Sequence, residues 1–411
     1  MSDIVITGIG VISSMGTGRE TFWESCQKAT TGIKKITAFD TSSLHSNVAG
    51  WIDDFEPRDY MSPRAYRRMS RISRLAVSSS VEALNDSGLN LENMGKEFIA
   101  VIVGTSYGSS SHVEDFFVSL LKDGPRGAQP FLFPETVPNA PASHMAMFHG
   151  ITGPNTTFCQ NEISAENAML YARNLLLQDI VDVVLVGGAD ELSAMQYACY
   201  DALGALNKIK INGDEPAAPK PGDGIILGEG AGTLVMERSD FAIKRGAKIY
   251  GQLKSGVMTG GPAAMGHYEV DGKQMGRAMS MAIEKAGIAP DEIDQIDVSA
   301  NFAAELGRME YQQLKTVFSD RPHELFITPL KYLMGDFGGA GIIRAAAILL
   351  SLYHQLPLPA LNVETLKVKP QDTLKWDIPA ISKIQTTLMT SSTFGGGSCS
   401  LIFTSHPDFS P

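Results

Sequence analysis

Short apolar runs alternate along this chain with stretches in which apolar positions recur at helical spacing. The apolar runs are typical of buried strands, and they lie at 4–12, 98–104, 181–188, 232–237, 249–258, 296–300, 384–393 and 398–404. The stretches with helical spacing lie at 73–88, 164–178, 275–287 and 341–353. Because strands that alternate with helices are usually joined by crossovers, this pattern predicts an α/β fold with a buried, largely parallel sheet.

The same pattern suggests two related halves. Each half has a strand that ends in a glycine-rich turn, after residues 4–11 and at 249–260, and then a strand, a turn and a long apolar helix, at 157–178 and at 326–353. No linker rich in proline, serine or glycine separates them, so we expect one body with halves at 1–250 and 251–411.

Two long connections interrupt the alternation, at 106–150 and at 205–222. Connections of this length inside a compact domain are usually functional or form interfaces. We therefore expect both segments to be functional or to form interfaces.

Charge and cysteine content exclude several classes of protein. The chain has 34 Lys+Arg against 45 Asp+Glu, a formal net charge of −11, and it contains no basic run, so a nucleic-acid partner is not expected. The cysteines are dispersed and have no metal-ligand spacing, so neither a disulfide framework nor a metal site is expected, and no cofactor is indicated. They are Cys26, Cys159, Cys199 and Cys399.

Membrane contact is not expected either. The first residues lack the basic region and the small-residue cleavage site of a signal peptide. The most apolar later stretch, 340–352, is interrupted by Arg344 and is too short to span a bilayer. These features predict a cytoplasmic protein.

Seven segments in a fixed order carry a more specific signal. They include VIVGTSYG, VDVVLVGGADE, PLKYLMGDFGGAG and SSTFGGGSCSLIF. Together they resemble the successive landmarks of the β-ketoacyl synthases, the condensing enzymes of fatty-acid and polyketide assembly, from about residue 3 to 405. The resemblance implies a thiolase-like fold of five layers, αβαβα, built from two pseudo-duplicated halves. It also implies a dimer that acts on substrates bound to an acyl carrier protein.

Enzymes of this family use a cysteine at a strand-to-helix elbow together with two histidines. Measured from Pro154 and from Gly187, the family's spacing assigns the cysteine's position to Glu162. The resemblance places Asn301 and Asp336 at the two histidine positions. The family's Lys331 and Glu229 are retained, and we expect both to tie loops together near the pocket. Catalytic residues are therefore not expected in this chain.

The substitutions change the chemistry that this site can perform. A glutamate cannot carry a thioester by ordinary transacylation, whereas a cysteine does so as a thiolate. An ionised Asp336 only accepts hydrogen bonds and would repel the enolate that forms when malonyl loses carbon dioxide. Three interpretations stay open: a vestigial pocket in which Lys331 neutralises Glu162 or Asp336, new acid–base chemistry by these two carboxylates, and decarboxylation of a malonyl carrier protein.

Within the family, the chain-length factors of type II polyketide synthases typically lack the elbow cysteine and pair with an active ketosynthase. The resemblance implies that this chain is such a silent subunit, which shapes a shared acyl or polyketide tunnel in an aromatic polyketide or aryl polyene pathway. It would meet an acyl carrier protein through the complex. The competing hypotheses are an acyl-thioester enzyme that uses Glu162 and Asp336, such as a malonyl-carrier-protein decarboxylase, and a protein that holds an acyl or carrier chain without reaction.

Partner contacts are expected at two places. The strand before the elbow, at 155–160, would continue a sheet across the two-fold axis of the dimer. Bulky side chains around the 106–150 segment would reach the partner and close the far end of its tunnel. The candidate residues are Phe116, Phe117, Phe131, Phe133, Thr156, Phe158 and Gln160.

Overall fold

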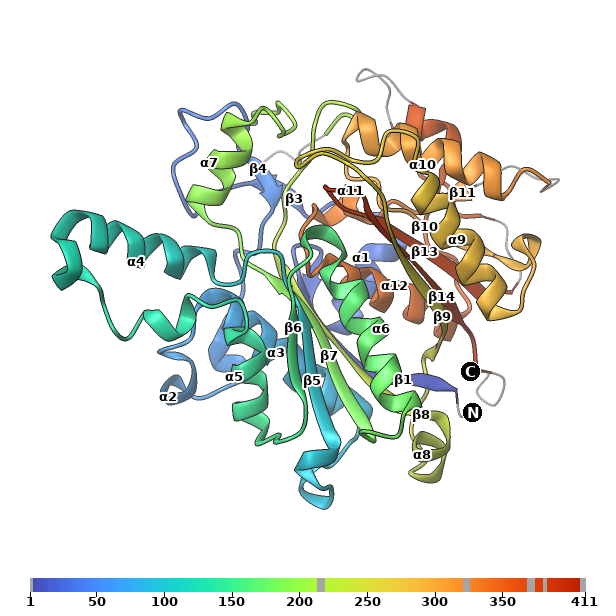
Figure 1. Cartoon of the computed structure of the whole chain (residues 1–411), viewed down its shortest axis with the longest axis horizontal. Helices are drawn as coiled ribbons and strands as arrows, with labels where there is room; N and C mark the ends of the chain where they lie inside the picture. Colours follow the sequence, from blue (N-terminus) through green and yellow to red (C-terminus); the bar gives the residue numbers. More distant parts are fainter. Residues whose placement is uncertain (1–2, 213–218, 321–325, 368–373, 380–382, 407–411) are drawn as a thin grey trace.

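One mixed sheet runs through the molecule (Figure 1). The computed structural model describes residues 3–212, 219–320, 326–367, 374–379 and 383–406. The strands of the sheet follow the order β10-β13-β14-β9-β1-β8-β7-β5-β6, and β2 pairs with β1. Their bounds are β1 (Ile4–Ser13), β2 (Gly16–Thr17), β5 (Ile99–Gly104), β6 (Asn155–Phe158), β7 (Val183–Asp190), β8 (Gly230–Arg238), β9 (Gly251–Gly260), β10 (Gln295–Asp297), β13 (Thr386–Ser392) and β14 (Gly397–Thr404).

Helices cover the sheet, and two short hairpins lie beside it. The helices are α1 (Arg19–Gln27), α2 (Pro63–Tyr66), α3 (Arg71–Ser87), α4 (Ser110–Asp123), α5 (Ala140–His149), α6 (Ser164–Leu177), α7 (Ala194–Ala202), α8 (Ser239–Lys244), α9 (Lys273–Ala286), α10 (Ala304–Val317), α11 (Lys331–Met334) and α12 (Ala340–His354). The short strands pair as β3 (Ile33–Lys35) with β4 (Val48–Gly50) and β11 (Phe326–Ile327) with β12 (Leu361–Asn362). Among the helices of the described segments, none has the length and apolarity needed to cross a membrane.

The strands form two sets that repeat one pattern of directions. In the set β1-β8-β7-β5-β6 the first two pairings are antiparallel and the last two are parallel. In the set β9-β14-β13-β10 the first two are again antiparallel and the third is parallel. The two sets pair with each other only at Val5–Gln252 and Ile6–Gly251. A division of the chain near residue 250, between β8 and β9, stays a prediction.

The expected largely parallel sheet is wrong, because five of the eight pairings along the strand order are antiparallel. Helical crossovers dictate parallel neighbours only for the strands that they connect. A four-residue turn at 393–396 joins β13 to β14, and so short a connection allows antiparallel pairing alone. Strand positions were predictable from buried apolar runs, whereas the directions of the other antiparallel pairs, such as β1 with β8, depend on pairing between strands far apart in the chain.

Helices α6 and α12 lie between the two sets of strands (Figure 1). Helices α3 and α5 cover the outer face of the first set, and α9, backed by α10, covers the outer face of the second. The layers therefore follow the predicted order αβαβα. Strands β1, β5 and β7 are buried along their whole length, which explains why they read as continuous apolar runs.

A charged cluster lies at the centre of these layers. Arg344, on α12, is fully buried and donates to Asp297 (2.7 Å), to the Thr390 carbonyl (2.7 Å) and to Ser391 (2.7 Å). Its second carboxylate partner is Glu166 on α6, at 3.3 Å. The guanidinium thus connects both central helices to β10 and β13.

We expect Arg344→Leu to lower the free energy of unfolding by about 3–5 kcal/mol, because two buried carboxylates would lose their counter-ion. Chemical denaturation measures this loss. The matched control is Arg58→Leu, whose side chain is 69% exposed and pairs with Glu56 at the surface; it should cost less than about 1 kcal/mol. Equal losses in the two variants would contradict the central role of Arg344.

Candidate functional site

The first site residue lies where β6 passes into α6. Glu162 sits in a single 3-10 turn, Asn161–Ile163, and its side chain is buried. Asn161 adopts a left-handed conformation with φ 48°, which asparagine tolerates better than most residues. The Ser164 hydroxyl accepts from the Gln160 amide (2.8 Å) and donates to the Asn161 carbonyl (2.7 Å), so the sharp turn is fixed from both sides.

A glycine-rich turn packs directly against this elbow. A Cβ atom at Gly338 would lie 2.4 Å from the Ser106 Oγ and 2.6 Å from the Asn161 carbonyl oxygen. The Gly338 carbonyl accepts a hydrogen bond from the Ala165 amide (3.2 Å). Glycine is needed here because the two backbones touch, and this contact brings the neighbouring Asp336 to the elbow.

Asp336 shares one cation and one amide with the residues around it. The Lys331 Nζ lies 2.7 Å from the Asp336 Oδ1, and both side chains are buried. The two groups form an ion pair without the geometry of a hydrogen bond. Neither the Lys331 Nζ nor the Asp336 Oδ1 atom has a hydrogen-bond partner among the described residues. The Asn301 Nδ2 donates to the Asp336 Oδ2 (2.6 Å) and to the Tyr268 hydroxyl (3.0 Å). Both amide hydrogens of Asn301 are therefore used inside the protein.

Glu162 is the less compensated of the two carboxylates. The Thr393 hydroxyl donates to its Oε2 atom. Burial, and then the charge of Asp336, raises the pKa of Glu162 to about 7, and the hydrogen bond from Thr393 and the charge of Lys331 offset this only in part. Burial beside a second carboxylate, with one lysine near both, is why Glu162 holds its proton more tightly than an exposed glutamate.

The space beside Glu162 is very small. The cavity between Glu162 and Asp336 has a volume of about 10 Å³, which is room for about one water molecule. Tyr107 and Tyr200 line it, and their hydroxyl groups lie 2.6 Å apart. On the other side of this tyrosine pair, a mostly apolar vestibule of about 710 Å³ opens between α4, α7 and Phe394.

This arrangement is poorly suited to stabilising a developing negative charge. Such chemistry needs hydrogen-bond donors aimed at the reacting oxygen. The Asn301 amide already donates to Asp336 and Tyr268, and the Lys331 ammonium pairs with Asp336. An enolate oxygen would have to compete with a buried carboxylate for each of these donors.

The structure brings four of the five predicted site residues together and places the fifth elsewhere. Glu162, Asn301, Lys331 and Asp336 form the network just described. Glu229 instead accepts from the Arg71 side chain (3.0 Å) and from the backbone amides of Ile52 (3.1 Å) and Leu192 (3.2 Å). It joins three separate segments and touches none of the other four.

Four residues of the site were not predicted from the sequence: Tyr107, Tyr200, Tyr268 and Thr393. Tyr107 and Thr393 lie inside segments that resemble family landmarks, VIVGTSYG and SSTFGGGSCSLIF, so the family pattern was the signal that could have identified them. Tyr200 and Tyr268 lie outside the segments that resemble family landmarks. Their contacts join segments that are distant in sequence.

The residues predicted for partner contacts lie on two surfaces. Thr156 and Phe158 belong to β6, which ends the strand order, and Gln160 follows it and is exposed. The four phenylalanines belong to an arm, residues 105–139, that projects from the body on α4 (Figure 1). Phe117, Phe131 and Phe133 are exposed, and Phe116 packs against Phe117 and Phe133 with ring centroids 5.9 and 6.0 Å apart.

Two family models together match most of the chain. The model described as "Beta-ketoacyl synthase, N-terminal domain" matches residues 1–242, and "Beta-ketoacyl synthase, C-terminal domain" matches residues 250–364.

Individual relatives are similar along their whole length. The 3-oxoacyl-[acyl-carrier-protein] synthase 2 of Vibrio cholerae is 27% identical over 97% of this chain and 98% of its own length. The tetracenomycin polyketide synthase ketoacyl synthase alpha subunit of Streptomyces glaucescens is 30% identical over 96% of this chain and 95% of its own length. The solved structure of the ishigamide ketosynthase/chain length factor is 26% identical, with a TM-score of 0.86 over 98% of this chain and 99% of that one. These matches confirm the thiolase-like fold.

We expect Glu162→Gln to stabilise the protein at neutral pH and to leave its stability almost unchanged at pH 4.5. The amide keeps an acceptor for Thr393 and removes the buried charge. Because the pKa of Glu162 is raised from 4.5 to about 7, the wild type loses stability as pH rises between these values and loses no more above them. The variant should gain about 1–3 kcal/mol at pH 8, since one pKa unit corresponds to ~1.4 kcal/mol.

Denaturant unfolding of both proteins at several pH values measures this difference. A gap between Glu162→Gln and wild type that stays constant from pH 4.5 to 8 would show that Glu162 has an ordinary pKa.

Proposed function

The chain belongs to the β-ketoacyl synthase family, and we propose that it serves there as a non-condensing partner subunit of the chain-length-factor type. It would pair with an active ketosynthase and shape the acyl or polyketide tunnel of the pair. The observation that carries this proposal is the closed network at the family's catalytic positions. Glu162, Asn301, Lys331 and Asp336 replace or engage the groups that condensation needs, and the cavity beside Glu162 and Asp336 has room for about one water.

The retained contact surfaces support a partner. Strand β6 is a sheet edge, and the arm on α4 carries exposed apolar side chains, among which Phe131 is 68% and Leu121 83% exposed. Exposed apolar patches and open strand edges usually mark interaction sites. A chain with no condensing site would have reason to keep both surfaces if a catalytic partner needs them.

The names of its relatives favour the same kind of assembly. One is an alpha subunit of a polyketide synthase ketoacyl synthase, and another is a ketosynthase/chain length factor. By analogy, we propose that an acyl carrier protein reaches this chain through the complex. Aromatic polyketide and aryl polyene assembly are the two proposed pathways, and mass spectrometry of the product made by the pair distinguishes them.

The competing enzyme hypothesis has less support from the geometry. Decarboxylation of a malonyl carrier protein needs room for the thioester and donors for its oxygen, but the cavity has room for about one water, the Asn301 amide is engaged, and the Lys331 ammonium pairs with Asp336. Carbon dioxide release from malonyl carrier protein by the purified chain, abolished by Glu162→Gln, would overturn the proposal of a silent subunit.

The direct experiment is co-expression with the ketosynthase encoded beside this chain. We expect the two chains to copurify as a complex whose mass corresponds to one copy of each. We expect this pair to extend acyl chains and this chain alone not to do so. A stable homodimer beside a neighbouring ketosynthase that is fully active alone would contradict the proposal.

We expect Phe131→Asp to weaken the pairing at least tenfold, because it places a charge on the apolar arm. Titration of the variant with the partner, followed by light scattering, measures the affinity. Ile243→Asp is the matched control, since Ile243 is an exposed apolar residue on α8, outside the arm. Equal weakening by both substitutions would remove the arm from the interface.

A further inference from the structure

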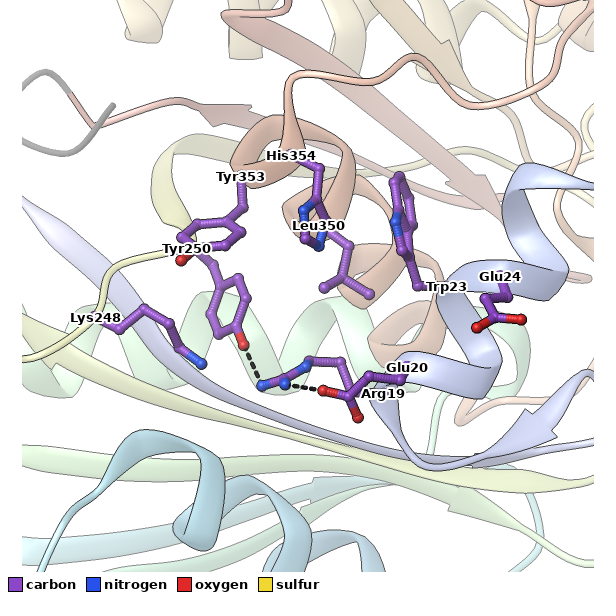
Figure 2. Close-up of a pocket in the computed structure, with 9 residues that line it drawn as sticks. All are labelled: Arg19, Glu20, Trp23, Glu24, Lys248, Tyr250, Leu350, Tyr353 and His354. Atoms are coloured by element: carbon purple, nitrogen blue, oxygen red, sulfur yellow. Dashed lines mark hydrogen bonds and ion pairs between the residues drawn. The ribbon is translucent and has the colours of Figure 1, made fainter. Parts of the chain in front are cut away.

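A second cleft lies on elements that the Glu162 network does not use. It is formed by α1, by the residues around the start of β9 and by the last turn of α12 (Figure 2). The elbow packs near the first turn of α12, and a helix of 15 residues is about 22 Å long. The cleft has a volume of about 230 Å³, and the buried Leu350 lines it.

Its walls are aromatic. Trp23 and His354 stack with ring centroids 5.2 Å apart and an interplanar angle of 20°. Tyr250 and Tyr353 form the second pair, with centroids 5.0 Å apart. In Figure 2 the two ring pairs flank Leu350. The volume is below the ~300–1,000 Å³ of pockets for drug-sized ligands, so the cleft suits one ring with a short tail.

The polar side of the cleft holds two cations on one carboxylate. The Lys248 Nζ lies 2.6 Å from the Asp86 Oδ1, and the Arg19 guanidinium contacts the same oxygen atom. Tyr250 also donates to Asp86 (2.9 Å). Arg19 has one further carboxylate partner, Glu20, whose side chain is 76% exposed. Asp86 is shared by both cations, so the second negative charge of this set comes from Glu20, an exposed side chain that a ligand carboxylate can replace.

The cleft also shifts the pKa of Lys248. Burial, and then the charge of Arg19, lowers the pKa of Lys248 to about 8, against a smaller opposing effect of Glu20. The pKa of His354 is also lowered, by burial and by Arg19 and Lys248. An added anion would favour the charged form of Lys248.

We propose that this cleft binds a small aromatic monocarboxylate, with its ring among Trp23, Tyr353 and His354 and its carboxylate between Arg19 and Lys248. The Arg19 guanidinium already donates a hydrogen bond to the carboxylate of Glu20, which shows that a carboxylate fits at this position. A ligand would replace that exposed side chain and also reach Lys248. Glu24 on the rim opposes anions of higher charge. The inference does not rest on the proposed function, because binding is measured on the chain alone.

The test uses 4-hydroxyphenylacetate as the probe and isothermal titration calorimetry as the measurement. Tyramine, which has the same ring and an ammonium group in place of the carboxylate, is the matched ligand control. We expect saturable binding of 4-hydroxyphenylacetate at pH 7 with a Kd below about 1 mM, and binding of tyramine at least tenfold weaker. Failure of 4-hydroxyphenylacetate to saturate, or equal affinity for tyramine, would overturn the proposal.

Variants assign the binding to this cleft. Lys248→Gln should weaken binding at least tenfold, and Glu20→Gln should leave it equal or tighter because it removes the competing carboxylate. Lys244→Gln, at an exposed lysine of α8 outside the cleft, is the matched control. Affinity for the wild type should fall as pH rises through about 8, because Lys248 loses its proton, and affinity for Lys248→Gln should not. Binding that is unchanged in Lys248→Gln would place the ligand elsewhere.

Discussion

The buried guanidinium of Arg344 fixes the geometry on which the rest of this molecule depends. It lies on the central helix α12 and bonds Glu166 of the other central helix, one turn after Glu162. Through Asp297 and Thr390 it also holds the second set of strands. The turn that carries Asp336 precedes α12, and the elbow that carries Glu162 precedes α6. One ionic cluster therefore sets the distance between the two turns from which the site is built.

Charge balance then decides what the site can do. The interior places one cation, Lys331, near two carboxylates, Glu162 and Asp336, and the cavity beside them has room for only about one water to solvate the excess charge. The protein meets this constraint by raising the pKa of Glu162 and by engaging the Asn301 amide. The contacts that stabilise these buried charges also engage the donors that a reaction would need, because the Asn301 amide and the Lys331 ammonium both contact Asp336.

Much of this was predictable from the sequence, for different reasons at different levels. Strands such as β5 and β7 are buried on both faces, so their apolar runs identified them. Spacing from Pro154 and Gly187 located Glu162, because the elbow is a local structure. The antiparallel directions of the sheet and the hydrogen bond from Thr393 to Glu162 were not predictable from local pattern, since they join segments far apart in the chain. For Glu229 the family pattern was less informative. This residue is retained within a family motif, yet it contacts Arg71, Ile52 and Leu192 and not the network around Asp336.

The contact between Tyr107 and Tyr200 separates two very different spaces, one of about 10 Å³ and one of about 710 Å³. That separation depends on two side chains that rotate about single bonds. The chemical character of the inner space depends instead on buried polar groups: Asn301 and Lys331 contact Asp336, and Thr393 donates to Glu162. Access to the inner space and the chemistry within it therefore depend on different residues, and a substitution at either tyrosine would change the first without changing the second.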